Sequence, residues 1–273
     1  MDTSPSPAPT QSDPSPPRRR LPRILLVTGV VVALLAGGGL WWFFDRDNPD
    51  EVDLDVAAKG VTTTTAAAGA SESSTPATDS GNGSASASGD LTGTWNVDTN
   101  SGEFDFESAT GTFAGFRIKE ELAGIGSTEA VGRTGDVSGS MTIDGTQVTA
   151  AEFTVDLTTI TTNESMRDRR VQDALGTSQN PTATFRLTSP IDLGADASTA
   201  SKVEVDAKGD LTVNGVTKSV TFPLQARLVD QTIVVVGSLD ITFSDFGVEI
   251  PSSPRVVSVE DHGKVELQVL LTR

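Results

Sequence analysis

The strongest constraint on the fold is a period-two alternation of apolar and polar residues, which recurs in short runs from Leu91 to the C-terminus. Successive side chains of a strand point to opposite sides, so each run predicts a strand with one apolar face. The runs are Phe104/Phe106, Phe153/Val155/Leu157, Ala183/Phe185/Leu187, Leu211/Val213, Val220/Phe222/Leu224, Leu239/Ile241/Phe243 and Val265/Leu267/Val269. Residues 91–273 are therefore predicted to form one all-β domain.

Turn residues separate these runs. Asn214-Gly215 predicts a hairpin with a type I′ turn, because Asn and Gly accept the positive φ that this turn needs. Asp144-Gly145, between Ile143 and Val148, predicts a second hairpin. The runs amount to about eight antiparallel strands, the number of a small closed barrel. A two-sheet sandwich has the same spacing and stays as the alternative.

One stretch breaks the strand pattern and predicts a short inserted helix. It extends from Thr162 to Leu175 and is followed by Gly176, which suits the position just after a helix end. Thr162 or Asn163 is the expected N-terminal cap.

Ile24–Phe44 carries no charged residue and is predicted to be a single transmembrane helix. At ~1.5 Å per residue its length matches a hydrocarbon core of ~30 Å. Trp41 and Trp42 near its end are typical of a membrane interface, and Arg18–Arg20 precede it while acidic residues follow. The predicted location is a cell membrane, with a cytoplasmic N-terminus and an extracytoplasmic C-terminal domain. A cleaved signal peptide is the competing interpretation.

The segments on either side of the predicted span have few apolar side chains. Residues 1–23 are rich in Pro and Ser and predict a disordered cytoplasmic tail. Residues 45–90 are acidic at first and then rich in Ser, Gly and Thr, which predicts a disordered linker.

The charge and the rare residue types exclude several functions. The formal net charge is −17, which disfavours nucleic acid as a partner. The chain has no Cys, and its single His is His262. Thiolate chemistry, a His-based metal site and a Ser-His-Asp site are therefore not expected. We predict no catalytic residue, no metal and no cofactor.

An ordered series of motifs runs along the predicted β-domain: Trp95-Asn96-Val97-Asp98, Gly132-Arg133-Thr134, Arg167-Asp168, Asn180-Pro181-Thr182, the block from Gly209 to Lys218, and Asp245-Phe246-Gly247-Val248. In this order the motifs resemble the YceI-like domain family of bacterial exported proteins, whose members are predominantly located outside the cytoplasm of bacterial cells. The resemblance implies an extended lipocalin-like barrel that binds a polyisoprenoid, such as the chain of a quinone, or another long-chain lipid. It is also compatible with a homodimer. This chain departs from the pattern at Lys119-Glu120-Glu121, where an apolar segment is common, and by its membrane anchor.

The expected ligand-binding residues are inward-facing side chains of the barrel. They are Phe104, Phe106, Phe153, Val155, Phe185, Leu211, Phe222 and Phe243. The alternative for each is that it only fills a packed core. Arg167 and Asp168 are candidates for a polar headgroup contact at the barrel mouth, with a structural role as their alternative. The rival function is a surface domain with a filled barrel that binds protein; an enzyme is the weakest hypothesis.

Overall fold

The structure is a computed structural model that describes residues 48–69, 90–107, 109–124, 126–199, 201–249 and 256–273. The predicted tail and transmembrane helix lie outside these ranges, as do residues 70–89 of the predicted linker. None of the helices within these ranges has both the length and the apolar character needed to cross a bilayer.

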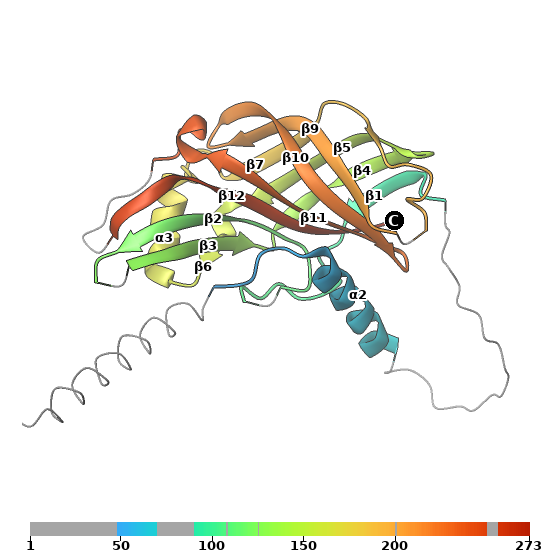
Figure 1. The fold of residues 1–273 in the computed structure, drawn as a ribbon, viewed down its shortest axis with the longest axis horizontal. Helices are drawn as coiled ribbons and strands as arrows, with labels where there is room; N and C mark the ends of the chain where they lie inside the picture. Colours follow the sequence, from blue (N-terminus) through green and yellow to red (C-terminus); the bar gives the residue numbers. More distant parts are fainter. Residues whose placement is uncertain (1–47, 70–89, 108, 125, 200, 250–255) are drawn as a thin grey trace, which may run out of the picture. The chain divides into compact units, whose positions relative to one another are not determined.

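Eight antiparallel strands form a closed ring (Figure 1). In ring order they are β1 (Gly93–Val97), β4 (Val137–Asp144), β5 (Gln147–Asp156), β7 (Thr182–Leu187), β9 (Val203–Val213), β10 (Val216–Val229), β11 (Thr232–Thr242) and β12 (Val256–Thr272). Pairing of β12 with β1 closes the ring. The predicted eight-stranded barrel is confirmed, and the sandwich is not formed.

The long strand β12 has two neighbours on one side. Near its C-terminus, Leu271 and Thr272 pair with β1, and farther back it pairs with β2 (Phe113–Leu122). From β2 the sheet continues through β3 (Gly126–Thr134) to β6 (Thr161–Thr162). A short β8 (Ile191–Asp192) pairs with β5. The wall beside β12 is therefore β1 at one end of the barrel and β2 at the other.

Both predicted hairpins are present. Asn214 and Gly215 join β9 to β10 with φ of 50° and 73°, which confirms the type I′ turn. Between β4 and β5, Asp144 pairs with Gln147, so the loop is Gly145-Thr146 and lies one residue later than predicted.

The inserted helix is α3 (Ser165–Ala174), and Gly176 follows it with φ of 64°, as predicted. The predicted caps are wrong, because Glu164 occupies the N-cap position and makes no side-chain capping bond. Thr162 instead belongs to β6, and its backbone N–H donates to Asp168 Oδ1 at 2.8 Å. Two short 3₁₀ helices, η1 (Leu157–Thr159) and η2 (Phe243–Phe246), follow β5 and β11.

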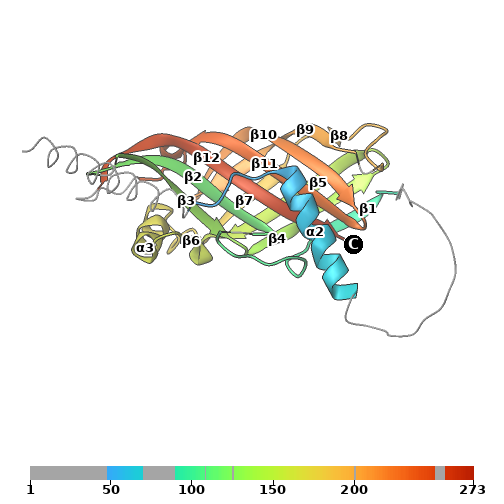
Figure 2. The same cartoon turned by 60° about the horizontal axis from the view of Figure 1, so that its bottom comes forward.

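A second helix, α2 (Leu54–Gly69), corrects the prediction of a disordered linker over this part of residues 45–90. Asp53 caps its start, since Asp53 Oδ1 accepts from the N–H groups of Asp55 and Val56, both at 2.9 Å. The helix packs on the outside of the barrel (Figures 1 and 2). The contact joins Leu54, Ala57 and Val61 of α2 to Val234, Val236 and Leu270 of β11 and β12.

Residues 48–53, which we call the strap, lead into α2 across the outer face of the barrel. Beneath the strap, the Glu266 carboxylate accepts from Arg117 Nε and Arg133 Nε, both at 2.8 Å. The Nη2 groups donate to the strap backbone: Arg133 to Asp50 O at 2.6 Å, and Arg117 to both Asp50 O and Pro49 O. Arg117 Nη1 donates to Glu129 Oε2 at 2.9 Å. The strap thus completes the hydrogen bonding of a charged cluster.

This cluster, Arg117, Arg133 and Glu266, is almost fully buried, at 3 %, 3 % and 1 % exposure. Burial is the largest influence on Arg133 and lowers its pKa, despite the opposing attraction of Glu266. Burial acts in the same direction on Arg117, but the carboxylates of Glu266 and Glu129 outweigh it and leave its pKa raised. A buried ion pair is stable only when its other donors and acceptors are bonded, which makes the strap carbonyls necessary.

Three different parts of the chain cover the outward face of β12. Val265, Leu267 and Val269 point inward, so the residue after each of them points outward. These are Glu266 beneath the strap, Gln268, whose amide donates to Gly111 O at 2.8 Å in the β1–β2 loop, and Leu270 beneath α2. The strap and α2 therefore form one compact unit with the barrel, and the predicted domain boundary at residue 91 is too late.

We predict that a fragment of residues 48–273 is more stable than one of residues 90–273 by roughly 4 kcal/mol. Deletion of the strap and α2 exposes Val234, Val236 and Leu270 and removes acceptors from two buried arginines. Urea unfolding monitored by circular dichroism measures the difference. Equal free energies of unfolding would show that the strap and α2 do not stabilise the barrel.

Replacement of Glu266 by Gln should destabilise the 48–273 fragment by about 3 kcal/mol, because two buried guanidinium groups lose their shared counter-charge. The matched control is Glu260→Gln, an exposed position on the same strand, which should change the free energy of unfolding very little. The same urea experiment compares the two, and similar values for both variants would contradict a role for the Glu266 charge.

Candidate functional site

The barrel encloses an apolar cavity of about 140 Å³, which we call the lumen. Its wall comes from seven ring strands, β2, the end of β3, η1, η2 and the residue after α3, and consists mainly of side chains at alternate strand positions. Among them are Ala114, Phe116, Val137, Phe153, Val155, Ala183, Phe185, Leu211, Val213, Phe222, Leu224, Val235, Ile241, Val265, Leu267 and Val269.

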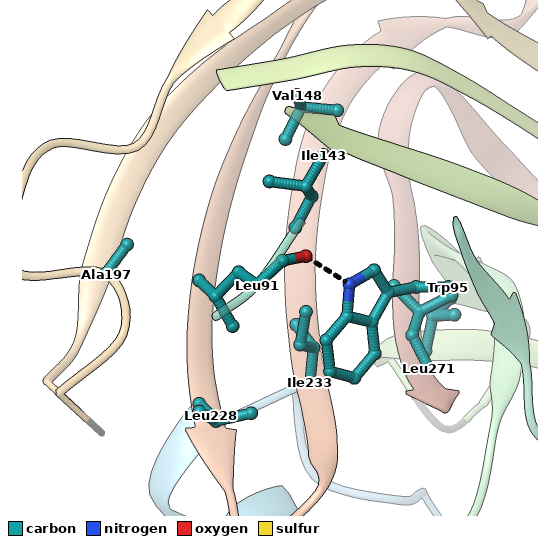
Figure 3. Close-up of a cluster of buried hydrophobic side chains, with 9 residues drawn as sticks. Leu91, Trp95, Ile143, Val148, Ala197, Leu228, Ile233 and Leu271 are labelled. Atoms are coloured by element: carbon teal, nitrogen blue, oxygen red, sulfur yellow. Dashed lines mark hydrogen bonds between the residues drawn. The ribbon is translucent and has the colours of Figure 1, made fainter. Parts of the chain in front are cut away.

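The two ends of the barrel differ. At one end a packed cluster around Trp95 fills the interior, and Trp95 Nε1 donates to Leu91 O at 2.8 Å (Figure 3). We call this the solid end. At the other end, next to α3, a second apolar cluster lines the lumen and forms what we call the hollow end. Its buried members are Leu157, Ile160, Leu175, Leu211, Val213, Phe243, Phe246 and Val248.

The sequence left open whether the barrel is filled or hollow, and each alternative describes one of these ends. Several inward-facing residues, such as Phe116, Phe185 and Ile241, are only partly buried although they lie inside the wall. Their remaining accessible surface faces the lumen, because packing does not fill the space around them.

Glycines on neighbouring strands provide room for the aromatic rings of the wall. Phe116 lies against Gly132, Phe185 against Gly209, Phe222 against Gly237 and Phe243 against Gly263. A Cβ atom on Gly132 would lie 2.3 Å from Phe116 Cε1, and one on Gly209 would lie 2.4 Å from Phe185 Cζ. Any larger residue at these positions would displace the ring from its place, so the glycines allow the rings to lie along the wall.

The same four rings contact one another in two pairs. Phe116 and Phe243 are 6.4 Å apart with planes at 84°, and Phe185 and Phe222 are 6.2 Å apart at 81°. Both are edge-to-face contacts, which stabilise aromatic pairs beyond their burial. They set the orientation of the rings around the lumen.

Polar groups are scarce on the lumen wall. Among the described residues that line it, Thr134, Thr184 and Glu266 have polar side chains, and the Glu266 carboxylate points away from the lumen to the outer face of the barrel. Thr134 Oγ1 is hydrogen-bonded to Thr159 Oγ1 at 2.7 Å, and the Glu266 carboxylate is bound by two arginines. A wall of this composition binds apolar matter by burial and offers little for acid–base or nucleophilic chemistry.

Comparison with known proteins identifies the family. The YceI-like domain model matches residues 95–271, which is well over half of the chain. This chain belongs to the YceI-like domain family.

Relatives of the YceI-like domain occur in several bacteria. A UPF0312 protein of Pseudomonas aeruginosa is 33 % identical over 160 residues, covering 54 % of this chain and 76 % of the relative. Protein YceI of Escherichia coli is 36 % identical over 123 residues, covering 44 % and 57 %. Among solved structures, a polyisoprenoid-binding domain from Saccharophagus degradans aligns at 16 % identity with a TM-score of 0.48, covering 65 % of this chain and 97 % of the other.

The YceI-like domain places most of the predicted binding residues on the lumen wall. They are Phe153, Val155, Phe185, Leu211, Phe222 and Phe243. Strand alternation was sufficient to find them, because all lie on or directly after ring strands. Their contact with a ligand stays a prediction.

The prediction that Phe104 and Phe106 are ligand-binding wall residues is wrong, since neither lines the lumen and no strand forms around them. They lie in the β1–β2 loop, where Asp105 Oδ1 accepts from Glu107 N at 3.1 Å and Gly102 has φ of 79°. Local turns of this kind replace strand pairing. The Phe104 side chain is 39 % exposed.

Arg167 and Asp168 contact protein groups and do not line the lumen. Arg167 donates to Glu120 Oε1 and Asn163 Oδ1, at 2.6 and 2.7 Å, while Asp168 accepts from Thr162. These contacts fit the structural alternative, and a headgroup contact stays a prediction.

The charged segment Lys119-Glu120-Glu121 does not obstruct the lumen. It lies on β2, where Lys119 and Glu121 are exposed and Glu120 is buried against Arg167. The sequence reasoning overlooked Phe116 earlier on this strand, which is a wall residue. Its alternation with Ile118 was the available signal.

Gly132→Ala should force the Phe116 ring off the wall and reduce binding of a fluorescent apolar probe several-fold. The physical reason is the 2.3 Å approach between the added Cβ and the ring. Fluorescence titration of the 48–273 fragment measures the effect, after circular dichroism shows that the variant is folded.

The control is the same substitution in a Phe116→Leu background, where the ring is absent. There, Gly132→Ala should leave probe binding nearly unchanged, because the two sites are coupled through one contact. An equal loss in both backgrounds would mean that the glycine acts in another way.

Proposed function

We propose that this YceI-like domain binds a long apolar lipid in its lumen, with a polyisoprenoid or isoprenoid quinone as the preferred class. The observation that carries the proposal is a lumen with apolar walls that is closed by packed side chains at the solid end and lined by apolar clusters at the hollow end. A chain inserted from the hollow end would gain ~0.8 kcal/mol for each buried CH₂ group.

The size of the lumen sets a condition on this function. About 140 Å³ resembles the ~150 Å³ apolar cavities that accept a single benzene-sized group, and it is below the range of larger ligand sites. A long chain therefore enters only if wall side chains change rotamer. The partly buried rings of Phe116 and Phe185 are the side chains with space to do so.

The same proposal places the domain outside the cytoplasm, on a membrane anchor formed by Ile24–Phe44. The arginines before this segment and the acidic residues after it support that orientation. A lipid taken from the bilayer would then have a short route to the barrel.

Binding without catalysis is part of the proposal. Thr134 on the lumen wall is already hydrogen-bonded to Thr159, and the Glu266 carboxylate is bound by two arginines on the outer face. The single histidine, His262, lies on β12 away from the wall. The rival function, a protein-binding surface on a filled barrel, assumes a packed interior, and in this barrel only the solid end is packed in that way.

Ala183→Phe should abolish lipid binding, because a ring at this lumen position occupies the space that a lipid chain needs. The 48–273 fragment and the variant are delipidated, incubated with a polyprenyl lipid and compared by native mass spectrometry. We expect a lipid-bound mass for the parent and at least a tenfold lower bound fraction for the variant.

The matched control is Val257→Phe, which adds a ring at a position that is 63 % exposed on β12. It should bind lipid as the parent does. A parent that takes up no lipid, and whose melting temperature polyprenyl ligands do not change, would reject the proposed function in favour of the filled-barrel alternative.

A further inference from the structure

We infer that the lipid enters the lumen through the side of the barrel, between β10 and β11, and that its polar end stays in a pocket on the outer face of this opening. This inference rests on the proposed lipid binding and deepens it. The ligand class assigned to the outer pocket is an uncharged headgroup with hydrogen-bonding oxygens, such as the hydroxyl of a prenyl alcohol.

Strands β10 and β11 pair over only part of their length. Pairing extends from their shared hairpin as far as Leu224 and Gly237. Beyond this point, residues 216–223 of β10 pair with β9 alone, and residues 238–242 of β11 pair with β12 alone. We call this unpaired stretch between the two strands the split. It lies at the hollow end, where β10 begins and β11 ends.

Pro223 marks the point where the pairing stops. The residues that flank a two-residue hairpin form a hydrogen-bonded pair, and such pairs recur at every second residue along an antiparallel ladder. Counting back from Val229, the N–H groups of residues 227 and 225 point toward β11, and the next residue in this series is Pro223. Proline has no N–H to donate and is typical of strand edges. The sequence of β10 therefore makes its first half an edge on the side of β11.

A pocket of about 650 Å³, which we call the side pocket, lies on the outer face of the split. Ser219 of β10 and both Asp240 and Thr242 of β11 are among its residues, so the unpaired strand edges border it. Ile241 and Phe246 line both the side pocket and the lumen. These two side chains therefore form the boundary between a polar outer space and the apolar interior.

The end of the barrel is closed by hydrogen bonds from one side chain. Asn214 Nδ2 donates to Gly247 O at 2.9 Å, and Asn214 Oδ1 accepts from Asn180 Nδ2 at 3.2 Å. These bonds join the β9–β10 hairpin, the residue after η2 and the turn after α3. A lipid that entered along the barrel axis would have to separate all three elements. At the split, a change of rotamer at the partly buried Ile241 is enough to connect the two spaces.

The charges around the side pocket largely cancel. Three of its cations are paired with acidic residues, in the ion pairs Lys264–Glu51 at 2.9 Å, Arg117–Glu129 at 2.9 Å and Lys218–Asp245 at 3.7 Å. Its other charged residues are Lys119, Asp240 and Glu260. A phosphate group would therefore meet no excess of positive charge here. An uncharged headgroup avoids this repulsion and can exchange hydrogen bonds with the unpaired backbone groups of the two strands.

Two photoreactive prenyl alcohols test the route, using the full chain mixed with phosphatidylcholine vesicles. The head probe carries a diazirine beside the hydroxyl group, and the tail probe carries it at the far end of the chain. Peptide mass spectrometry locates the cross-linked residues after illumination. We expect the head probe to label Ser219 and Asp240 at the split, and the tail probe to label lumen residues such as Phe153 and Val235.

The two probes separate this inference from the proposed function. Labelling of residues 177–181 by the head probe, together with lumen labelling by the tail probe, would overturn the side route and leave lipid binding intact. A tail probe that labels no lumen residue would reject the proposed function, and the side route with it.

Competition against the head probe tests the headgroup class. Unlabelled prenyl alcohol should suppress labelling at a several-fold lower concentration than a prenyl phosphate of the same chain length. Asp240→Lys adds positive charge to the side pocket and should reduce this preference several-fold. The matched control is Asp196→Lys, the same change at an exposed position in the β8–β9 loop, which should leave the preference unchanged. Equal competition by both compounds in the parent chain would overturn the uncharged headgroup, and equal effects of both substitutions would overturn the role of the side pocket.

Discussion

The structure depends on one buried carboxylate, that of Glu266, placed between Arg117 and Arg133 on the outer face of the barrel. Three charged groups at a barrel wall would normally face water. Here the strap covers them, and its backbone oxygens accept the hydrogen bonds that water would otherwise supply. The charged cluster therefore ties the N-terminal segment to the barrel and determines where the chain enters the domain.

The two ends of the barrel interior are packed differently. Trp95 and its neighbours close one end by dense packing, while at the other end rings rest against glycines and leave a lumen. Because Gly132 and Gly209 lack a Cβ, the rings of Phe116 and Phe185 lie along the wall. The glycines beside these rings thus give them room to lie along the wall of the lumen.

Much of the fold could be predicted from local sequence patterns. Alternation on β5, β7, β9, β10 and β12 found most wall residues, and Asn214-Gly215 located a hairpin. Phe104 and Phe106 alternate in the same way but lie in a loop, because alternation cannot show whether a partner strand is present. The α2 helix was overlooked although Asp53 precedes Leu54, Ala57, Ala58 and Val61 at helical spacing, since the low-complexity residues around it obscured the pattern.

The sequence by itself determined the strand pattern, the hairpin at Asn214-Gly215, the end of α3 at Gly176 and the family, because each follows from residues close together in the chain. Only the tertiary structure decided that Asn48 to Val61 belong to the domain and that one end of the barrel is hollow. Both facts depend on contacts between residues far apart in the chain, such as Asp50 with Arg133 and Phe116 with Phe243, and local patterns carry no information about such contacts.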